Sequence, residues 1–213
     1  MPGEADESGA GPKPGAAMRT DEQLVGDYRN GDDAALVELI ERYRPELFHF
    51  LARFVNSKTT ADDLFQETFL QVHLSADTFD VTKRFKPWLY TIAANKARDW
   101  LRRNKRHRAM PLDAAVDGQD GTPFVDLMEA DFPMPDATAD DAEVAELVRQ
   151  VVGELPDHLR EVLLLAYFQR LAYKEIAESL GVPLGTVKSR LHAAVGTFAQ
   201  VWKARHATLG SGA

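Results

Sequence analysis

The 213-residue sequence contains no cysteine. This absence excludes disulfide bonds, catalysis by a thiol and every zinc site that needs a cysteine ligand. No apolar run approaches the roughly 18 residues of a membrane-spanning helix, so we expect no insertion into a membrane. The first residues (MPGEADESGAGPKPGAAM) contain acids and no apolar core segment, unlike a signal peptide. These absences are compatible with a protein of the reducing cytoplasm.

The sequence also lacks the usual signatures of a catalytic site. Its six histidines are scattered, and no pair has the spacing of metal ligands. It has neither a GxSxG motif nor a glycine-rich loop that could bind phosphate. Asp62, Asp63 and Glu67 could in principle form a carboxylate site, but no basic or histidine-bearing cluster lies beside them. We therefore expect no catalytic residue, no metal site and no cofactor.

The formal net charge is −8, but the charges are unevenly distributed. Residues 83–108 contain ten lysines and arginines and a single acid, and residues 184–206 contain four and no acid. Between them, residues 111–148 contain eleven aspartates and glutamates and no lysine or arginine. Two basic segments on either side of an acidic one are compatible with nucleic-acid binding, although the net charge alone argues against it.

The hydrophobic pattern predicts an all-α protein, because apolar residues recur at intervals of three and four without sustained alternation. Thr20 and Gln23 form a capping box at the start of a short first helix. A longer helix follows over residues 36–54, in which Pro45 predicts a kink or a break. Thr60 is expected to cap a third helix. A fourth helix is expected to bury one apolar face between residues 85 and 101.

The second half of the chain is expected to begin with a flexible acidic linker, because residues 109–141 are rich in glycine, proline and acids. A second helical domain then starts near Ala142, and Asp157 is expected to cap its next helix. Two more short helices follow, from Tyr173 and from about Leu184. The expected organisation is a tail at 1–19, a helical domain at 20–108, the linker at 109–141, a second helical domain at 142–206 and a tail at 207–213.

Residues 173–192 (YKEIAESLGVPLGTVKSRLH) have the spacing of a helix-turn-helix motif. Ala177 falls where two helices would cross, and its small side chain would let them approach. Gly181, four residues later, permits the positive φ of the turn. Val187 is spaced to pack back onto the first helix. The pattern predicts that the second helix, from about Leu184, enters the major groove of DNA.

The second helix of this motif has five outward-facing positions that could contact DNA. They are Thr186, Lys188, Ser189, Arg190 and His192. Lysine and arginine can donate to guanine, and each good base contact contributes about 1–3 kcal/mol. The alternative is a helical hairpin that only packs against its neighbours. The absence of acids in the second helix favours DNA binding.

The basic segment at residues 84–108 carries polar residues on the face opposite its apolar stripe. Asn95, Arg98, Arg102 and Arg106 share that face, and Lys96 and Arg103 lie beside it. A charged helix face is by default a solvated face. The presence of two separate basic helices in one chain favours nucleic-acid binding over that alternative.

Three segments together resemble the extracytoplasmic-function group of sigma-70-type sigma factors. They are DDLFQETFLQVH (62–73), FKPWLYTIAANKARDWLRR (85–103) and EIAESLGVPLGTVKSRLH (175–192). The resemblance covers about Leu24 to Arg106 and Val144 to Val201. It implies two small helical domains, a region 2 bundle and a region 4 helix-turn-helix domain. It also implies a sigma subunit that directs core RNA polymerase to promoter DNA.

The resemblance further implies roles for individual residues. Those implied to dock on core polymerase are Asp62, Asp63, Gln66 and Glu67. Asn95 is implied to line a pocket for a flipped base of the −10 strand, and the strand backbone is implied to contact Lys96, Arg98, Arg102 and Arg103. At the −35 element, bases are implied to contact Lys188, Ser189 and His192, and phosphates to contact Thr186 and Arg190. One departure is Ala193, where the family often has arginine.

Two other interpretations remain open at this point. The acids of residues 62–67 could simply favour the dipole of an ordinary amphipathic helix. The chain could also be a helix-turn-helix regulator that binds duplex DNA as a dimer without replacing a sigma subunit, but this leaves residues 62–73 and 85–103 unexplained. The resemblance implies core polymerase, promoter DNA and an anti-sigma protein as partners, in the cytoplasm and at the nucleoid. It also implies that the acidic linker threads through polymerase channels; the alternative is a solvated flexible tether.

Overall fold

The computed structural model describes residues 18–107 and 142–209, and every regular element within these ranges is helical. The all-α prediction is therefore confirmed. The predicted acidic linker and most of both predicted tails lie outside the described residues. The α-helices are α1 (Asp21–Arg29), α2 (Asp33–Val55), α3 (Lys58–Ser75), α4 (Phe85–His107), α5 (Ala142–Glu154), α6 (Asp157–Leu163), α7 (Tyr173–Leu180) and α8 (Leu184–Leu209).

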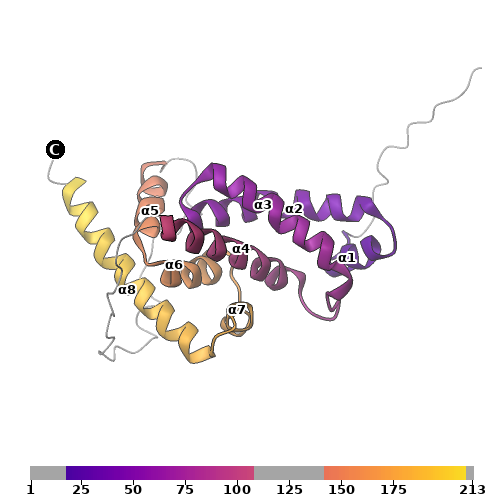
Figure 1. Cartoon of the computed structure of the whole chain (residues 1–213). Coiled ribbons are helices and arrows are strands. Elements are labelled where there is room, and N and C mark those ends of the chain that lie inside the picture. Colours follow the sequence, from indigo (N-terminus) through magenta and orange to yellow (C-terminus); the bar gives the residue numbers. More distant parts are fainter. Residues whose placement is uncertain (1–17, 108–141, 210–213) are drawn as a thin grey trace, which may run out of the picture.

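Helices α1 to α4 form the first domain around an aromatic core (Figure 1). Phe50, Phe54, Phe85 and Tyr90 are almost completely buried there, and the Phe50 and Tyr90 rings meet edge to face with centroids 5.1 Å apart. Burying one large apolar side chain contributes about 1.5–3 kcal/mol. A few such residues therefore hold α4 against α2 and α3.

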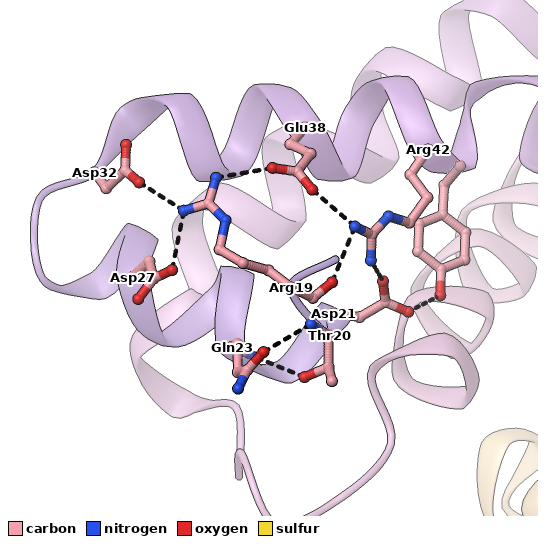
Figure 2. A network of polar contacts seen from close by, with 9 residues as sticks. Arg19, Thr20, Asp21, Gln23, Asp27, Asp32, Glu38 and Arg42 are labelled. Carbon is pink, nitrogen blue, oxygen red and sulfur yellow. Dashed lines mark hydrogen bonds and ion pairs between the residues drawn. The ribbon is translucent and has the colours of Figure 1, made fainter. Parts of the chain in front are cut away.

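The start of α1 is fixed by the predicted capping box and by an ion-pair network. Gln23 and Thr20 exchange backbone-to-side-chain hydrogen bonds of 3.2 and 2.8 Å. Figure 2 shows Arg19 between three carboxylates, with nitrogen-to-oxygen distances of 3.0 Å to Asp27, 3.0 Å to Asp32 and 2.8 Å to Glu38. Since these acids lie on α1, at the N-cap of α2 and within α2, the network ties the chain entering α1 to the next helix.

One alternative and one local prediction in this domain were wrong. Of the kink or break predicted at Pro45, the break does not occur, because α2 runs without interruption from Asp33 to Val55. Because Pro45 is exposed, the carbonyl that loses its amide partner can bind water instead. The cap of α3 is Ser57 and not Thr60, since the Ser57 hydroxyl accepts a 3.3 Å hydrogen bond from the amide of Thr60.

Helices α5 to α8 form the second domain, and two expectations for it also need correction. Asp157 is the first residue of α6 and does not cap it, because Pro156 occupies the cap position. The last helix is not short: α8 has 26 residues. Between α6 and α7, residues 164–168 form a π-helical turn that the sequence pattern did not indicate.

The two domains pack against each other in this structure. In Figure 1, α4 runs between the α2–α3 pair and helices α6 and α7. Helix α7 contacts α4 directly, and α5 and α6 contact α2. One face of the basic helix α4 is therefore covered by the second domain.

Candidate polymerase and promoter interfaces

The four residues predicted to dock on polymerase share the exposed face of α3. Asp62, Asp63, Gln66 and Glu67 are all exposed, while Leu64, Phe65, Thr68 and Phe69 on the other side of the helix are buried. The amphipathic pattern of α3 therefore presents an acidic surface, and the packing of its apolar side leaves that surface free within the described part of the chain.

The same face of α3 continues into two leucines that the sequence analysis did not assign. Leu70 and Leu74 are 58% and 67% exposed, although leucine usually packs inside. They follow Glu67 by three and seven residues, which places them on its side of the helix. The signal was present in the sequence as apolar positions outside the buried stripe of α3. We refer to these six residues together as the α3 surface.

The structure brings one residue of the α3 surface close to the predicted strand-binding residues. The ammonium group of Lys96 on α4 lies 3.8 Å from the Glu67 carboxylate. The predicted polymerase-binding and −10-binding residues therefore lie next to each other on adjacent helices. A contact that displaces either Lys96 or Glu67 from this ion pair therefore changes the charge next to the other residue.

The polar residues of α4 already have partners within the protein. Asn95 is exposed, and its side-chain oxygen accepts a hydrogen bond from Arg98. Arg102 pairs with Asp99 at 2.9 Å, and the Nε of Arg103 donates to the Asp99 carbonyl at 3.2 Å. Exposed ion pairs contribute at most about 1 kcal/mol, so little free energy is lost when these pairs are exchanged for phosphate contacts.

The start of α4 is fixed by an acid from α1. The Phe85 amide donates a 2.8 Å hydrogen bond to the carboxylate of Glu22. Burial opposes the charge of Glu22, but this hydrogen bond and others hold its pKa below its usual value. The preceding loop exposes Val81, Lys83 and Arg84. The loop therefore exposes two cationic side chains and an apolar one next to the first turn of α4, which the Glu22 hydrogen bond holds in place.

Helices α7 and α8 have the geometry that the helix-turn-helix spacing predicted. Gly181 has φ of +64°, and the Val182 amide donates to the Ala177 carbonyl at 3.1 Å, which closes α7. Val187 is completely buried, as its position in the motif requires. The predicted starts of α7 and α8 are confirmed.

The five predicted −35 residues are not equally accessible. Lys188 and Ser189 are exposed, while Thr186, Arg190 and His192 are half-buried. The Ser189 hydroxyl donates to the Thr186 carbonyl at 3.1 Å, so its oxygen remains able to accept a further hydrogen bond. Lys188 and Ser189 form the most prominent part of this surface.

Helix α6 buries two adjacent charged residues that the sequence pattern did not single out, Arg160 and Glu161. Arg160 donates to three backbone carbonyls: Phe54 at 2.6 Å, Gly153 at 2.9 Å and Leu155 at 2.9 Å. Since Phe54 belongs to the first domain, this side chain links the two domains. The signal was an Arg-Glu pair inside an otherwise apolar helical run.

Glu161 is the buried counter-ion of an arginine from the other domain. Its carboxylate lies 3.2 Å from Nε of Arg98, but the two groups are not aligned for a hydrogen bond. Burial raises the pKa of Glu161 to about 7, although the positive charges of Arg98 and Arg190 act to lower it. Glu161 therefore faces two predicted DNA-binding residues, one from each domain.

Within residues 18–107 and 142–209, no group of histidine and acidic side chains is arranged to hold a metal ion. No helix in the same part of the chain is both long and apolar enough to cross a membrane.

Two family models match the sequence. The model described as Sigma-70 region 2 matches residues 39–107, and that described as Sigma-70, region 4 matches residues 145–197. The ECF RNA polymerase sigma factor SigW of Bacillus subtilis is 32% identical over 168 residues, which cover 79% of this chain and 89% of that protein. The RNA polymerase sigma-H factor of Pseudomonas aeruginosa is 33% identical over 172 residues, with coverages of 80% and 88%.

Solved structures show the same fold. CnrH, in complex with the cytosolic domain of CnrY, has a TM-score of 0.61 and 24% identity, covering 86% of this chain and 97% of that chain. The sigma factor RpoE from Bartonella quintana, in complex with the anti-sigma factor NepR, has a TM-score of 0.57 and 20% identity, with coverages of 83% and 97%. Both similarities span the two helical domains.

Proposed function

Because the chain belongs to the sigma-70 family of RNA polymerase sigma factors, in its extracytoplasmic-function group, we propose that it binds core polymerase and directs it to promoters by −35 duplex readout and −10 strand capture. The observation that carries this proposal is that both family regions are matched in order. The protein would supply binding energy for promoter selection, and the polymerase would perform the phosphoryl chemistry.

Docking on core polymerase is assigned to the α3 surface. Its acids Asp62, Asp63 and Glu67, together with Gln66, are exposed and lie beside the exposed Leu70 and Leu74. A polar rim next to exposed leucines has the composition of a protein-binding surface. Helix α3 begins at Lys58 and has no acid in its first turn, so the alternative that these acids only favour the helix dipole is not supported.

The −35 contact is assigned to the start of α8. Lys188, Ser189 and His192 would contact base edges in the major groove, and Thr186 and Arg190 would contact phosphates. The positive φ of Gly181 and the buried Val187 support this arrangement, because they set the angle between α7 and α8.

The −10 contact is assigned to α4. Asn95 would line the pocket for a flipped base, and the backbone of the separated strand would lie along Lys96, Arg98, Arg102 and Arg103. The exposed position of Asn95 supports the first assignment. The local ion pairs of Lys96 and Arg102 would be exchanged for phosphate contacts on binding.

An anti-sigma protein is the proposed regulatory partner. Such proteins accompany fold relatives, including the Bartonella quintana factor solved with NepR. The proposed location is the cytoplasm, with association with the nucleoid when the protein is bound to polymerase. A regulator that only binds duplex DNA would account for α7 and α8 but not for the match of residues 39–107 to region 2.

The test is reconstituted transcription. Purified full-length protein should enable core polymerase to initiate at discrete sites on a genomic DNA library, and the shared upstream sequences would define the promoter. Asn95→Ala should then slow strand opening more than initial binding, as measured by the permanganate reactivity of the −10 thymines. A protein that binds duplex DNA but never replaces the sigma subunit would support the regulator instead.

A further inference from the structure

Helix α1 contacts both ends of the loop that leads into α4. At the far end, the Glu22 carboxylate accepts the 2.8 Å hydrogen bond from the amide of Phe85, the first residue of α4. At the near end, the Arg29 guanidinium donates to the Phe79 carbonyl at 3.2 Å and lies 3.8 Å from the Asp77 carboxylate. Glu22 and Arg29 are seven residues apart, close to two helical turns, so they lie on the same face of α1. One face of α1 therefore holds the loop both where it begins and where it ends.

Between these two ends the loop is bonded internally. The Asp80 carboxylate accepts hydrogen bonds of 3.0 and 2.7 Å from the amide and the hydroxyl of Thr82. The buried Phe79 ring packs on Trp88 of α4, with ring centroids 4.8 Å apart. Beyond this anchor, residues 80–84 are all exposed. The loop is therefore a preformed turn with fixed ends, and its exposed tip lies beside the helix to which strand capture is assigned.

Helix α1 is in turn fixed to α2 by the polar network of Figure 2. The Asp21 carboxylate accepts a 2.5 Å hydrogen bond from Arg42 and another from the hydroxyl of the buried Tyr43. The Tyr43 ring also meets the Phe85 ring edge to face, with centroids 5.5 Å apart. A satisfied polar network of this kind holds one arrangement, because its groups would lose their partners in another. The loop is therefore connected through α1 to the body of the first domain.

We propose that Glu22 and Arg29 are positioning residues for strand capture, which hold the loop of residues 79–84 and the first turn of α4 in one arrangement before the −10 strand arrives. The inference rests on the proposed function, because it adds α1 to the elements that form the −10 contact. The match to the region 2 model covers residues 39–107 and assigns no role to α1, which precedes it. A loop that is ordered beforehand loses less conformational entropy on binding, so the strand is bound more tightly.

The alternative is a structural role alone, in which Glu22 caps α4 as any acceptor at a helix start would. That role predicts a loss of stability without a specific loss of strand capture. Ser57→Ala supplies the comparison, because it removes the hydroxyl that accepts from the Thr60 amide at the start of α3, in the same domain. Ser57 belongs to none of the surfaces assigned to polymerase or DNA, so its variant is a matched control for a lost cap.

Polymerase reconstituted with Glu22→Ala should open promoter DNA at least about fivefold more slowly than polymerase with Ser57→Ala, at equal occupancy of the closed complex. Permanganate reactivity of the −10 thymines measures opening, and urea denaturation compares the stabilities of the two variants. Glu22→Gln should restore the parental rate, because its amide oxygen can accept from the Phe85 amide. The proposal is overturned if Glu22→Ala opens DNA as fast as Ser57→Ala, or if folded Glu22→Gln is as slow as Glu22→Ala.

A second measurement needs neither polymerase nor DNA. Arg29 is exposed at the end of α1, so Arg29→Ala tests the other end of the loop without disturbing a helix start. Amide hydrogen exchange over residues 79–85 should be faster in Arg29→Ala and in Glu22→Ala than in the parent. The Ser57→Ala control should exchange there at the parental rate. Parental exchange in both loop variants would overturn the proposal, whereas failure of the parent to initiate with core polymerase would instead refute the proposed function.

Discussion

The two basic helices differ in how they present their charge. On α8, Lys188 is exposed, and within residues 18–107 and 142–209 no carboxylate lies within ion-pair distance of it. On α4, Lys96, Arg98 and Arg102 each lie within 4 Å of a carboxylate, and that of Arg98 belongs to the other domain. Lys188 of the proposed −35 surface therefore needs no exchange of an ion pair, whereas the proposed −10 residues of α4 would have to exchange partners before binding.

This difference corresponds to the chemistry proposed for each helix. Duplex DNA presents its groove continuously, so a reader can be permanently exposed. A single strand exists only after melting, and a free cationic helix would bind other nucleic acid nonspecifically in the meantime. Prior pairing of α4 with carboxylates would suppress such binding, because each ion pair has to be broken before a phosphate can take its place.

The largest effect is expected from Arg160→Ala, which removes one hydrogen bond between the domains and two within the second domain. It leaves three buried carbonyls without their donor, so the free energy of unfolding should fall by about 3–5 kcal/mol. Urea denaturation measures this. The control is Arg149→Ala, at a half-exposed i,i+3 pair, where the loss should stay below about 0.5 kcal/mol. Equal losses of unfolding free energy in the two variants would contradict this prediction.

The second prediction concerns the pH dependence caused by Glu161. Its pKa is raised from 4.5 to about 7, so the native state holds this proton longer than the unfolded chain. Its contribution to stability is thus fully present below pH 4.5 and is lost as pH rises through 7. The difference in unfolding free energy between wild type and Glu161→Gln should change over that window by an amount on the order of 3 kcal/mol. Denaturation at several pH values measures it, with exposed Glu178→Gln as control; a constant difference would contradict the prediction.

The third prediction tests whether α8 is ready to bind. Lys188→Ala should weaken binding of the free protein to a −35 duplex by about 1–3 kcal/mol, because a base contact is lost. Lys203→Ala, also exposed on α8 but beyond the motif, should have little effect. Fluorescence anisotropy at fixed moderate salt measures both. Similar losses at the two lysines would show that α8 contributes only general positive charge.

The smallest effect is expected at the turn that orients α8. Gly181→Ala should cost about 1 kcal/mol, because φ is +64° while no atom lies within 4 Å of the added Cβ. Gly196→Ala, in the interior of α8 and equally uncrowded, should instead stabilise by about 0.5–1 kcal/mol. Thermal unfolding distinguishes the two signs. A loss of stability in both variants would mean that the positive φ of Gly181 is not what distinguishes the two positions.

The parts of the fold that depend on local pattern could be predicted from the sequence. The capping box at Thr20, the start of α7 and the buried Val187 all follow from spacing within a few residues. Errors arose where several local solutions compete: Ser57 and Thr60 are both plausible caps, and an exposed proline such as Pro45 is tolerated in a long helix.

The contact between the domains could not be predicted in this way. Glu161 and Arg98 are 63 positions apart, and nothing in the pattern around either of them indicates the other. A charged pair inside an apolar run does indicate burial, but its partners depend on how separately folded units meet. The roles of the individual DNA-facing residues remain predictions, because they depend on a nucleic acid that the fold alone does not specify.

The acceptors of Arg160 have a consequence for protein engineering. All three are main-chain oxygens near the carboxyl ends of α2 and α5, where helix dipoles concentrate negative charge. The planar guanidinium group of arginine has several N–H donors and can reach all three oxygens, whereas the compact ammonium group of a lysine cannot. Because a main-chain oxygen is present whatever the residue, the docking site on α2 does not depend on side-chain identity there. Chimeras that exchange first domains between relatives should therefore retain this hydrogen bond to α2 as long as the arginine remains.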